Sequence, residues 1–358
     1  MRVEEFDYEL PEELIAQTPL KDREQSRLLV VDPVAQTMVH TRFSQIGQHL
    51  RPGDVLVLNN SRVLPARLYA EKEDTGAKVE LLLSRPVAEY EWWALARPAK
   101  RLHVGNRLIF HQGREGATCT GVRAEVLEVA EGGLRRLRFE VEGPMSGFLE
   151  RVGEVPLPPY IHTPLANRER YQTVYASQPG SVAAPTAGLH FTHRLLDEIA
   201  KQGVEIQYVT LHVGIGTFRP VKAERVEEHT MHSEVYEVPE TVAAAVNRAR
   251  AEGRRVIAVG TTAMRTLESA GASGVVQAGP GETDIFIYPG YRFCIVDALI
   301  TNFHLPKSTL IMLVAAMMGT EFTKRVYAEA VEQRYRFFSF GDAMFITRKA
   351  EWKGEGAR

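Results

Sequence analysis

Apolar and polar positions along the chain follow two different patterns. In the first, runs such as residues 55–58 and 255–259, which are apolar except for Arg255, end in turn or polar residues. This pattern predicts strands buried on both faces of a sheet. Residues 205–211 predict another strand. Segments 195–202 and 239–252 predict helices that are each followed by a glycine. Strands that alternate with helices are typical of an α/β domain.

The second pattern covers residues 68–150, where short β-type runs alternate with glycine-containing turns and no helix is expected. The runs lie at residues 78–83, 91–96, 107–110, 123–127 and 137–141. Closely spaced strands of this kind predict a small barrel or sandwich. We therefore expect a mixed α/β protein. Residues 1–67 and 151–358 would form a discontinuous α/β domain, and residues 68–150 an inserted β domain.

Further segments carry specific expectations. Residues 10–16 predict a short helix, residues 284–288 predict a strand, and the C-terminal part is expected to be helical to about residue 335. The longest apolar run, residues 310–318, is too short to cross a bilayer and predicts a buried core helix. We expect no signal segment and no membrane association.

Composition narrows the class of protein. Of the 358 residues, 44% are hydrophobic and 25% are charged, which is ordinary for a globular chain with its own core. The two cysteines, Cys119 and Cys294, lie far apart, so no disulfide framework or zinc ribbon is expected. A reducing, cytoplasmic setting fits this composition. With a formal net charge of −2, a nucleic-acid partner would need a local basic patch.

Polar loops follow several of the predicted strands, which is where α/β sheets bind ligands. The loop at residues 184–191 places Thr186, Gly188 and His190 before a helix start, where backbone amides can hold a carboxylate. An N-cap turn with a packed histidine is an equally good explanation. The two glycines of the loop at residues 211–219 let a ligand approach the backbone, and a tight turn is the alternative.

Two later segments also combine polar groups with an apolar strand. In residues 260–268, Arg265 either reaches a ligand or pairs with Glu268 at i, i+3 of the same helix. Residues 299–309 place more polar and basic groups between two apolar runs than a solvated loop needs. This excess favours a functional role for that loop.

A metal site is not expected. His229 and His232 resemble a metal-binding pair, but no third ligand follows at a fixed spacing. Capping or hydrogen-bonding roles are favoured for them instead, and a general-base role is the alternative. The chain also has no P-loop, G-x-S-x-G elbow or H-E-x-x-H motif, which disfavours simple NTPases, serine hydrolases and zinc proteases.

Together these motifs resemble one family, the S-adenosylmethionine:tRNA ribosyltransferase-isomerases of queuosine biosynthesis. The matching stretches are residues 8–17, 26–30, 53–67, 182–192, 211–221, 229–234, 259–262 with 265–268, 282–291 and 299–308. Each stretch alone is modest evidence, whereas all of them in the family's order are specific. The weakest match is the middle of the β region, residues 112–138.

The resemblance implies a mixed α/β domain with an inserted β-barrel domain. It implies a reaction in which the ribosyl group of S-adenosylmethionine is transferred to 7-aminomethyl-7-deazaguanine at the wobble position of tRNA and isomerised. The products would be epoxyqueuosine, adenine and methionine. S-adenosylmethionine would be a co-substrate, no metal would be needed, and the protein would supply a base, orientation and exclusion of water. We expect a monomer whose partner is this tRNA.

The resemblance and the loop positions suggest three groups of site residues. The expected S-adenosylmethionine pocket consists of Thr186, Ala187, Gly188, Phe191, Gly214, Gly216, Thr217, Thr261, Thr262 and Arg265. The candidate proton-transfer residues are His190, His212 and His304, ranked ahead of His232. The candidate RNA contacts are Asn59, Asn60, Arg62, Arg67, Lys100, Arg101, Arg168 and Arg170. For each of these, a solvated surface position is the alternative.

Two other functions compete with this hypothesis. An S-adenosylmethionine-dependent RNA methyltransferase would normally carry a glycine-rich loop after its first strand, whereas the early strand here is followed by Asn59-Asn-Ser-Arg62. A non-catalytic RNA-binding module built on the inserted β domain would not explain why the polar loops cluster in the α/β part.

Overall fold

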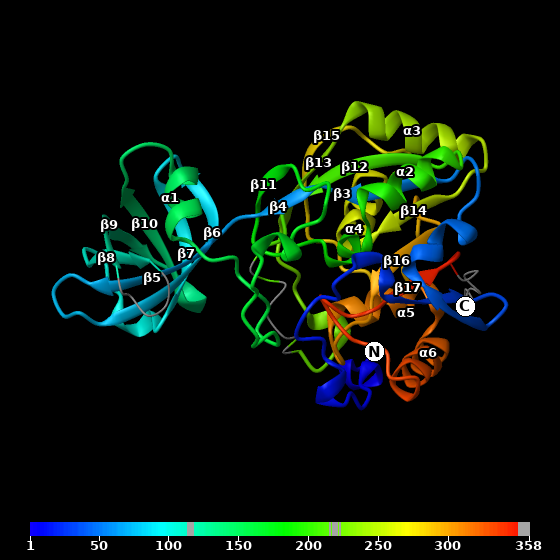
Figure 1. Cartoon of the computed structure of the whole chain (residues 1–358), viewed down its shortest axis with the longest axis horizontal. Helices are drawn as coiled ribbons and strands as arrows, with labels where there is room; N and C mark the ends of the chain where they lie inside the picture. Colours follow the sequence, from blue (N-terminus) through cyan, green and yellow to red (C-terminus); the bar gives the residue numbers. More distant parts are fainter. Residues whose placement is uncertain (113–117, 215, 217–220, 222, 350–358) are drawn as a thin grey trace. The chain divides into compact units, whose positions relative to one another are not determined.

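The computed structural model describes residues 1–112, 118–214, 216, 221 and 223–349. The chain divides into two compact units (Figure 1). The larger unit consists of Met1–Ser61, Pro159–Gln178 and Ala184–Arg358, and the smaller unit of Arg62–Pro158 and Pro179–Ala183. A short two-stranded sheet pairs β4 (Ser61–Val63) with β11 (Gln178–Ser181).

In the described part of the larger unit, nine strands form one sheet. Their order is β15 (Gly279–Thr283), β13 (Glu234–Val238), β12 (Glu205–Leu211), β3 (Val55–Asn59), β14 (Val256–Val259), β16 (Ala298–Asn302), β17 (Ala343–Ile346), β1 (Arg27–Asp32) and β2 (Thr37–Arg42). The four central strands β12, β3, β14 and β16 run parallel. Their carboxyl ends therefore meet at one edge of the sheet, where ligands bind in α/β folds.

Helices cover both faces of this sheet. Val256 and Ala258 of β14 face a cluster built from α3 (Glu240–Ala251), α4 (Gly260–Ala270), α5 (Thr309–Met318) and α6 (Thr320–Glu332). Ile257 and Val259 face the opposite cluster, which includes α2 (His193–Lys201) and the 3₁₀ turns Phe43–His49 and Thr186–His190. The alternation of apolar side chains on a strand buried on both faces produces these two layers.

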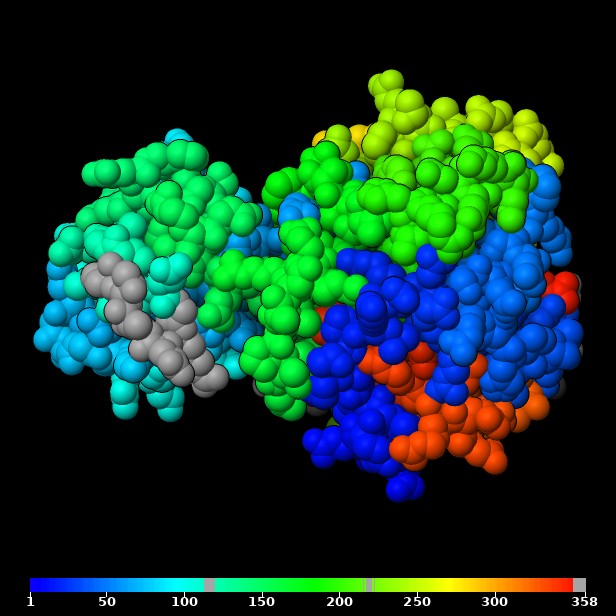
Figure 2. Space-filling model, in the orientation of Figure 1, coloured from blue at the N-terminus to red at the C-terminus, as the bar shows by residue number. Residues whose placement is uncertain are grey.

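The two ends of the described chain pack together in the larger unit. Ile15 forms a parallel bridge with Phe337, and the N-terminal segment lies against the C-terminal part in the space-filling view (Figure 2). The short helix predicted at residues 10–16 forms only in part, as the 3₁₀ helix Glu12–Leu14 with Pro11 before it. The chain beyond that turn donates from the Ala16 amide to the Phe337 carbonyl, which helical geometry would prevent. The predicted buried helix at residues 310–318 is confirmed by α5.

The predicted strand at residues 284–288 is also wrong. The strand is β15, immediately before it, and it pairs with β13. Ile285 instead turns over α4: its amide bonds to the Thr283 hydroxyl, and its carbonyl accepts from Arg265. Side-chain contacts with α4 thus replace a strand ladder in this segment.

The smaller unit contains a closed six-strand antiparallel barrel in its described residues. The order is β10 (Leu134–Glu140), β7 (Glu91–Arg97), β6 (Lys78–Ala88), β5 (Arg67–Lys72), β8 (Arg107–Gln112) and β9 (Thr118–Val129). The predicted mixed α/β fold with a small β-barrel is confirmed. The expectation of no helix here is wrong, because α1 (Met145–Val152) packs Phe148 against Phe110 at 5.7 Å between ring centroids. Its buried positions Met145, Phe148, Leu149 and Val152 follow helical spacing, which was the signal in the sequence.

Candidate active site at the carboxyl edge of the sheet

Asn59, the last residue of β3, connects the ends of neighbouring strands. Its amide nitrogen donates to the Leu211 carbonyl at 3.0 Å and to the Thr262 hydroxyl at 3.1 Å. Its amide oxygen accepts from the Leu211 amide at 3.0 Å. Asn59 is fully buried and these bonds occupy its side chain, so it links the end of β12 to the start of α4. The sequence had suggested an RNA contact for this residue.

His212 follows directly after the end of β12. Its backbone amide donates to the Val235 carbonyl at 3.0 Å, which fixes the start of the loop. Its ring atom Nδ1 is buried and has no hydrogen-bond partner among the described residues. Burial lowers the pKa of His212 below its ordinary value, so the ring is neutral near pH 7. A neutral imidazole with an unoccupied nitrogen is able to accept a proton.

A buried ion pair positions the next part of this loop. The Gly214 amide donates to Glu234 Oε1 at 3.0 Å, and Glu234 Oε2 accepts from Arg265 Nη1. The Glu234 and Arg265 side chains are 6% and 8% exposed, so the pair is enclosed by protein. Arg265 Nη2 is buried without a partner in the described part of the chain.

The alternative pair between Arg265 and Glu268 is not the one that forms. Glu268 is fully buried and accepts from the amides of Ile295 at 3.0 Å and Val296 at 2.8 Å. It therefore anchors the chain that leads into β16.

The 3₁₀ turn Thr186–His190 lies over the start of α4. At Gly260, whose φ is +86°, an added Cβ would lie 3.6 Å from the Ala187 Cβ and 3.7 Å from the Thr262 hydroxyl oxygen. Thr261 is 9% exposed and Thr262 is half-buried at the same helix start. Two of the loops expected to bind S-adenosylmethionine are thus in direct contact.

Two members of the predicted pocket have a packing role in this turn. At Gly188 an added Cβ would lie 2.0 Å from the Tyr175 hydroxyl oxygen and 2.8 Å from the Thr173 methyl group, so packing alone requires glycine there. Phe191 is fully buried and meets the Phe43 ring edge to face at 4.9 Å. The described contacts of Gly188 and Phe191 are therefore packing contacts within the protein.

His190 is buried and both of its ring nitrogens have partners. The Asn302 amide nitrogen lies 3.1 Å from the Phe338 carbonyl and 3.2 Å from His190 Nε2, so it donates to both. The proton of the ring is then on Nδ1, which donates to the Ser26 hydroxyl at 2.7 Å. Ser26 in turn donates to the Arg23 carbonyl. Burial, followed by nearby arginine charges, lowers the pKa of His190 to about 3.

His304 is held in a similar way. Its Nε2 bonds to the Thr301 hydroxyl at 2.8 Å, its amide donates to the Tyr327 hydroxyl at 3.1 Å, and its carbonyl accepts from Tyr8. Burial lowers the pKa of His304 to about 3. Its ring is therefore a neutral and tightly held part of the core.

Comparison with known proteins shows the family of the chain. The family described as queuosine biosynthesis protein matches residues 3–346. The chain belongs to this family. The family predicted from the sequence is thereby confirmed, as is the prediction that the chain is an enzyme.

Two relatives cover almost the whole chain. An S-adenosylmethionine:tRNA ribosyltransferase-isomerase from Natranaerobius thermophilus is 52% identical over 348 residues, which are 97% of this chain and 99% of the relative. The crystal structure of an S-adenosylmethionine tRNA ribosyltransferase from Thermotoga maritima has 40% sequence identity and a TM-score of 0.55. That match covers 96% of this chain and 99% of the other.

The remaining residues of the predicted pocket belong to the loop that follows β12. Gly214 has open space where a Cβ would stand, whereas at Gly216 a Cβ would lie 2.3 Å from a ring carbon of His232. The His229 ring meets Phe286 edge to face at 5.3 Å. Thr217 lies outside the described residues. Within the described chain, no three His, Cys, Asp or Glu side chains gather as a metal site requires.

The candidate RNA contacts are divided between the two units. Asn60, Arg168 and Arg170 belong to the larger unit, and Arg62, Arg67, Lys100 and Arg101 to the smaller. Lys100 and Arg101 are exposed on the 3₁₀ turn Ala99–Arg101, and Arg168 is exposed. Arg67 is half-buried and donates to the Leu157 carbonyl at 3.3 Å. Asn60 accepts from the Thr210 hydroxyl at 2.7 Å. None of the helices in the described residues has the length and apolar character needed to cross a membrane.

Proposed function

We propose that this chain transfers the ribosyl group of S-adenosylmethionine to 7-aminomethyl-7-deazaguanine at the wobble position of tRNA and isomerises it. The products are epoxyqueuosine in the tRNA, free adenine and free methionine. One observation carries the proposal: hydrogen bonds of Asn59 and Glu234 connect the loop 212–214 to the first turns of α4. Ala187, in the 3₁₀ turn Thr186–His190, packs against the start of the same helix. The names and high identity of the relatives support the reaction class.

The protein has a limited chemical task in this reaction. The sulfonium of S-adenosylmethionine acidifies the neighbouring carbon, and adenine and methionine are the leaving groups. The enzyme must remove one proton, hold the ribose against the amine of the tRNA base, and keep water away. It also has to return a proton to a leaving group, since adenine departs as a neutral base.

His212 is the base in this proposal. His190 can accept a proton only at Nε2, which would first have to lose the bond it accepts from Asn302. His304 uses Nε2 on the Thr301 hydroxyl and is clamped through its backbone. His212 has a neutral ring and an Nδ1 that is buried without a described partner. His190 and His304 have pKa values lowered to about 3, which makes both of them weak bases. His190 and His304 then act as positioning residues for the sheet edge.

The S-adenosylmethionine pocket is assigned to the loops that meet at this edge. Gly214 offers an open backbone surface, and the hydroxyls of Thr261 and Thr262 stand at the start of α4. Thr262 accepts one bond from Asn59 and keeps its own proton for a ligand. Arg265 Nη2 supplies a charged donor. Thr186 is half-buried on the turn above.

The tRNA enters as an unpaired anticodon loop, because only a splayed base can present its aminomethyl group to the ribose. Phosphate contacts from Asn60, Arg62, Arg67, Lys100, Arg101, Arg168 and Arg170 are part of the proposal. If each cation neutralises phosphate, the affinity for tRNA falls steeply as salt rises. A flat salt dependence between low and moderate ionic strength would contradict these contacts.

Product analysis tests the proposed function. The full chain is incubated with S-adenosylmethionine and tRNA that carries the aminomethyl base, and the small molecules and tRNA nucleosides are then separated by mass. Adenine together with a ribosyl-derived adduct on the tRNA supports the proposal. S-adenosylhomocysteine together with a methylated tRNA would instead support the RNA methyltransferase alternative and overturn it.

A further inference from the structure

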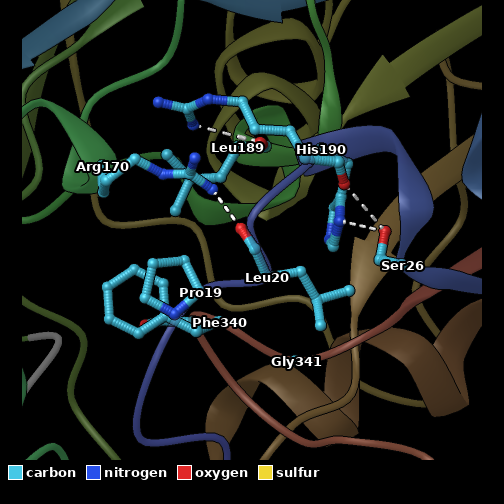
Figure 3. Close-up of a pocket in the computed structure, with 10 residues that line it drawn as sticks. Pro19, Leu20, Ser26, Arg170, Leu189, His190, Phe340 and Gly341 are labelled. Carbon is cyan, nitrogen blue, oxygen red and sulfur yellow. Dashed lines mark hydrogen bonds between the residues drawn. The ribbon is translucent and has the colours of Figure 1, made fainter.

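A cavity in the larger unit opens beside His190. Its walls include Pro19, Leu20, Arg23, Arg170, His190 and Phe340 (Figure 3). Figure 3 shows Arg170 reaching toward the Leu20 carbonyl and His190 bonded to Ser26 at the opposite side. Its chemistry is set by the two arginines.

Both arginines are held by backbone carbonyls. Arg23 donates to the Leu189 carbonyl at 3.1 Å and to the Glu169 carbonyl at 2.9 Å. Arg170 donates to the carbonyls of Lys21 at 2.8 Å and Leu20 at 2.5 Å. Backbone carbonyls orient a guanidinium group but do not neutralise it. The two side chains are therefore fixed in place with their charge intact.

The positive charge around the cavity exceeds the negative charge that is paired with it. Among the described residues, no carboxylate oxygen lies within 4.0 Å of the guanidinium groups of Arg23, Arg170 or Arg336. Arg170 Nε and Arg336 Nη1 are buried without a partner in the same part of the chain. Arg336 is close enough for its charge to lower the pKa of His190.

The electrostatics agree with this geometry. Burial, followed by the charge of Arg170, lowers the pKa of Arg23 to about 10. The carboxylate of Glu169 acts in the opposite direction but does not compensate for these two effects. Half-buried cations whose charge is only partly compensated are unfavourable, and an anion that enters the cavity relieves both desolvation and mutual repulsion.

We propose that Arg23 and Arg170 form an oxyanion-binding subsite beside His190. Guanidinium groups bind planar or tetrahedral oxyanions through paired N–H···O bonds. The substrates named in the proposed function carry two such groups, the backbone phosphates of the tRNA and the carboxylate of S-adenosylmethionine. The choice between these two sources rests on that function, whereas the subsite itself rests on the cavity and its arginines.

The charge state of His190 affects this subsite. Because its pKa is lowered to about 3, the ring is neutral near pH 7 and adds no further cation to a wall that already carries two arginines. The bond from His190 to Ser26 also holds the chain next to Arg23. His190 is thus a positioning residue for the subsite.

The test is direct binding to the full chain with Arg170→Gln and Arg170→Lys. Arg325→Gln is the matched control, because Arg325 lies exposed on α6, where its guanidinium stacks on Phe322. Thermal unfolding first shows that each variant is folded. Dissociation constants are then measured for S-adenosylmethionine, for 5′-methylthioadenosine, which lacks the carboxylate, and for substrate tRNA at several salt concentrations.

Because Arg170→Gln removes a charge-assisted contact, we expect it to lower the affinity for one of the two substrates by about tenfold or more. If phosphate is bound, tRNA affinity falls and the slope of log affinity against log salt drops by about 1. If the carboxylate is bound, affinity for S-adenosylmethionine falls and affinity for 5′-methylthioadenosine stays unchanged. Arg170→Lys keeps the charge but loses the planar guanidinium group, so we expect a smaller decrease in affinity for the same ligand. If Arg170→Gln is unfolded, the affinities of Arg170→Lys test the subsite.

Affinities within twofold of the unmodified chain for every ligand in a folded Arg170 variant would overturn the subsite. So would an equal loss in Arg325→Gln. These assays need no turnover, so they separate this proposal from the proposed function. An unmodified chain that binds both substrates but releases no adenine refutes the reaction and leaves the subsite to be judged by binding alone.

Discussion

At the scale of single residues, hydrogen-bond partners separate three histidines that the sequence treats alike. His190 and His304 are enclosed and bonded, and His212 has a buried nitrogen without a described partner. Sequence position placed all three after strands or before helices, which is why they were grouped. The distinction depends on Ser26, Thr301 and Asn302, whose contacts are set only by folding.

Substituting His212→Ala removes the proposed base. We expect kcat to fall by about 10²- to 10⁴-fold while KM for S-adenosylmethionine changes little, because general-base catalysis contributes in this range. His193→Ala, an exposed histidine on α2, is the control and keeps full activity. Steady-state adenine release measures both. A His212→Ala enzyme with kcat within threefold of the unmodified enzyme would remove His212 from the mechanism.

The pKa values of His190 and His304, each lowered to about 3, predict how stability depends on pH. Between pH 6.5 and pH 3 the unfolded chain binds these protons and the folded chain does not, so protonation favours unfolding. This stability is complete above pH 6.5 and is lost as pH falls. Each histidine contributes a slope of up to about 1.4 kcal/mol per pH unit.

Urea unfolding at pH 7, 6 and 5 measures that slope. His304→Gln keeps a side chain able to bond to Thr301 but cannot be protonated, so it lowers the slope by about 1.4 kcal/mol per pH unit. An unchanged slope in this variant would show that His304 does not stay neutral in the folded protein.

At the scale of elements, the site is built by contacts between segments that are distant in sequence. Helical spacing suggested that Arg265 pairs with Glu268, yet Arg265 crosses to Glu234 at the start of β13. Glu268 is drawn away by the backbone amides of Ile295 and Val296. Local rules rank partners along one helix, and they carry no information about which strand a helix will lie beside.

Substituting Glu234→Gln tests this link between β13 and α4. The variant keeps an acceptor for the Gly214 amide but leaves the charge of Arg265 buried and unpaired. We expect a loss of about 3–5 kcal/mol in the free energy of unfolding and a raised KM for S-adenosylmethionine. Glu237→Gln, exposed on the same strand, is the matched control. Equal stability of the two variants would contradict the role of the ion pair.

At the scale of the whole molecule, periodicity was enough to predict the two kinds of structure. Apolar runs identified the parallel strands β3 and β14. Closely spaced β-type runs predicted a small barrel or sandwich, and the family resemblance implied the barrel that forms. The meeting of the loops proposed for S-adenosylmethionine could also be predicted, because carboxyl ends of parallel strands share one edge. The hydrogen bonds of Asn59 and Glu234 could not be predicted, since each depends on which strands become neighbours. The Arg23–Arg170 cavity escaped prediction for the same reason.

The central claim is that adenine and methionine both leave while the ribosyl carbon skeleton stays on the tRNA. The most direct measurement follows S-adenosylmethionine labelled separately in adenine, ribose and methionine during one turnover with tRNA that carries the aminomethyl base. We expect one adenine and one methionine to be released for each ribose label that becomes bound to tRNA. Adenine and ribose labels that leave together as S-adenosylhomocysteine would contradict it.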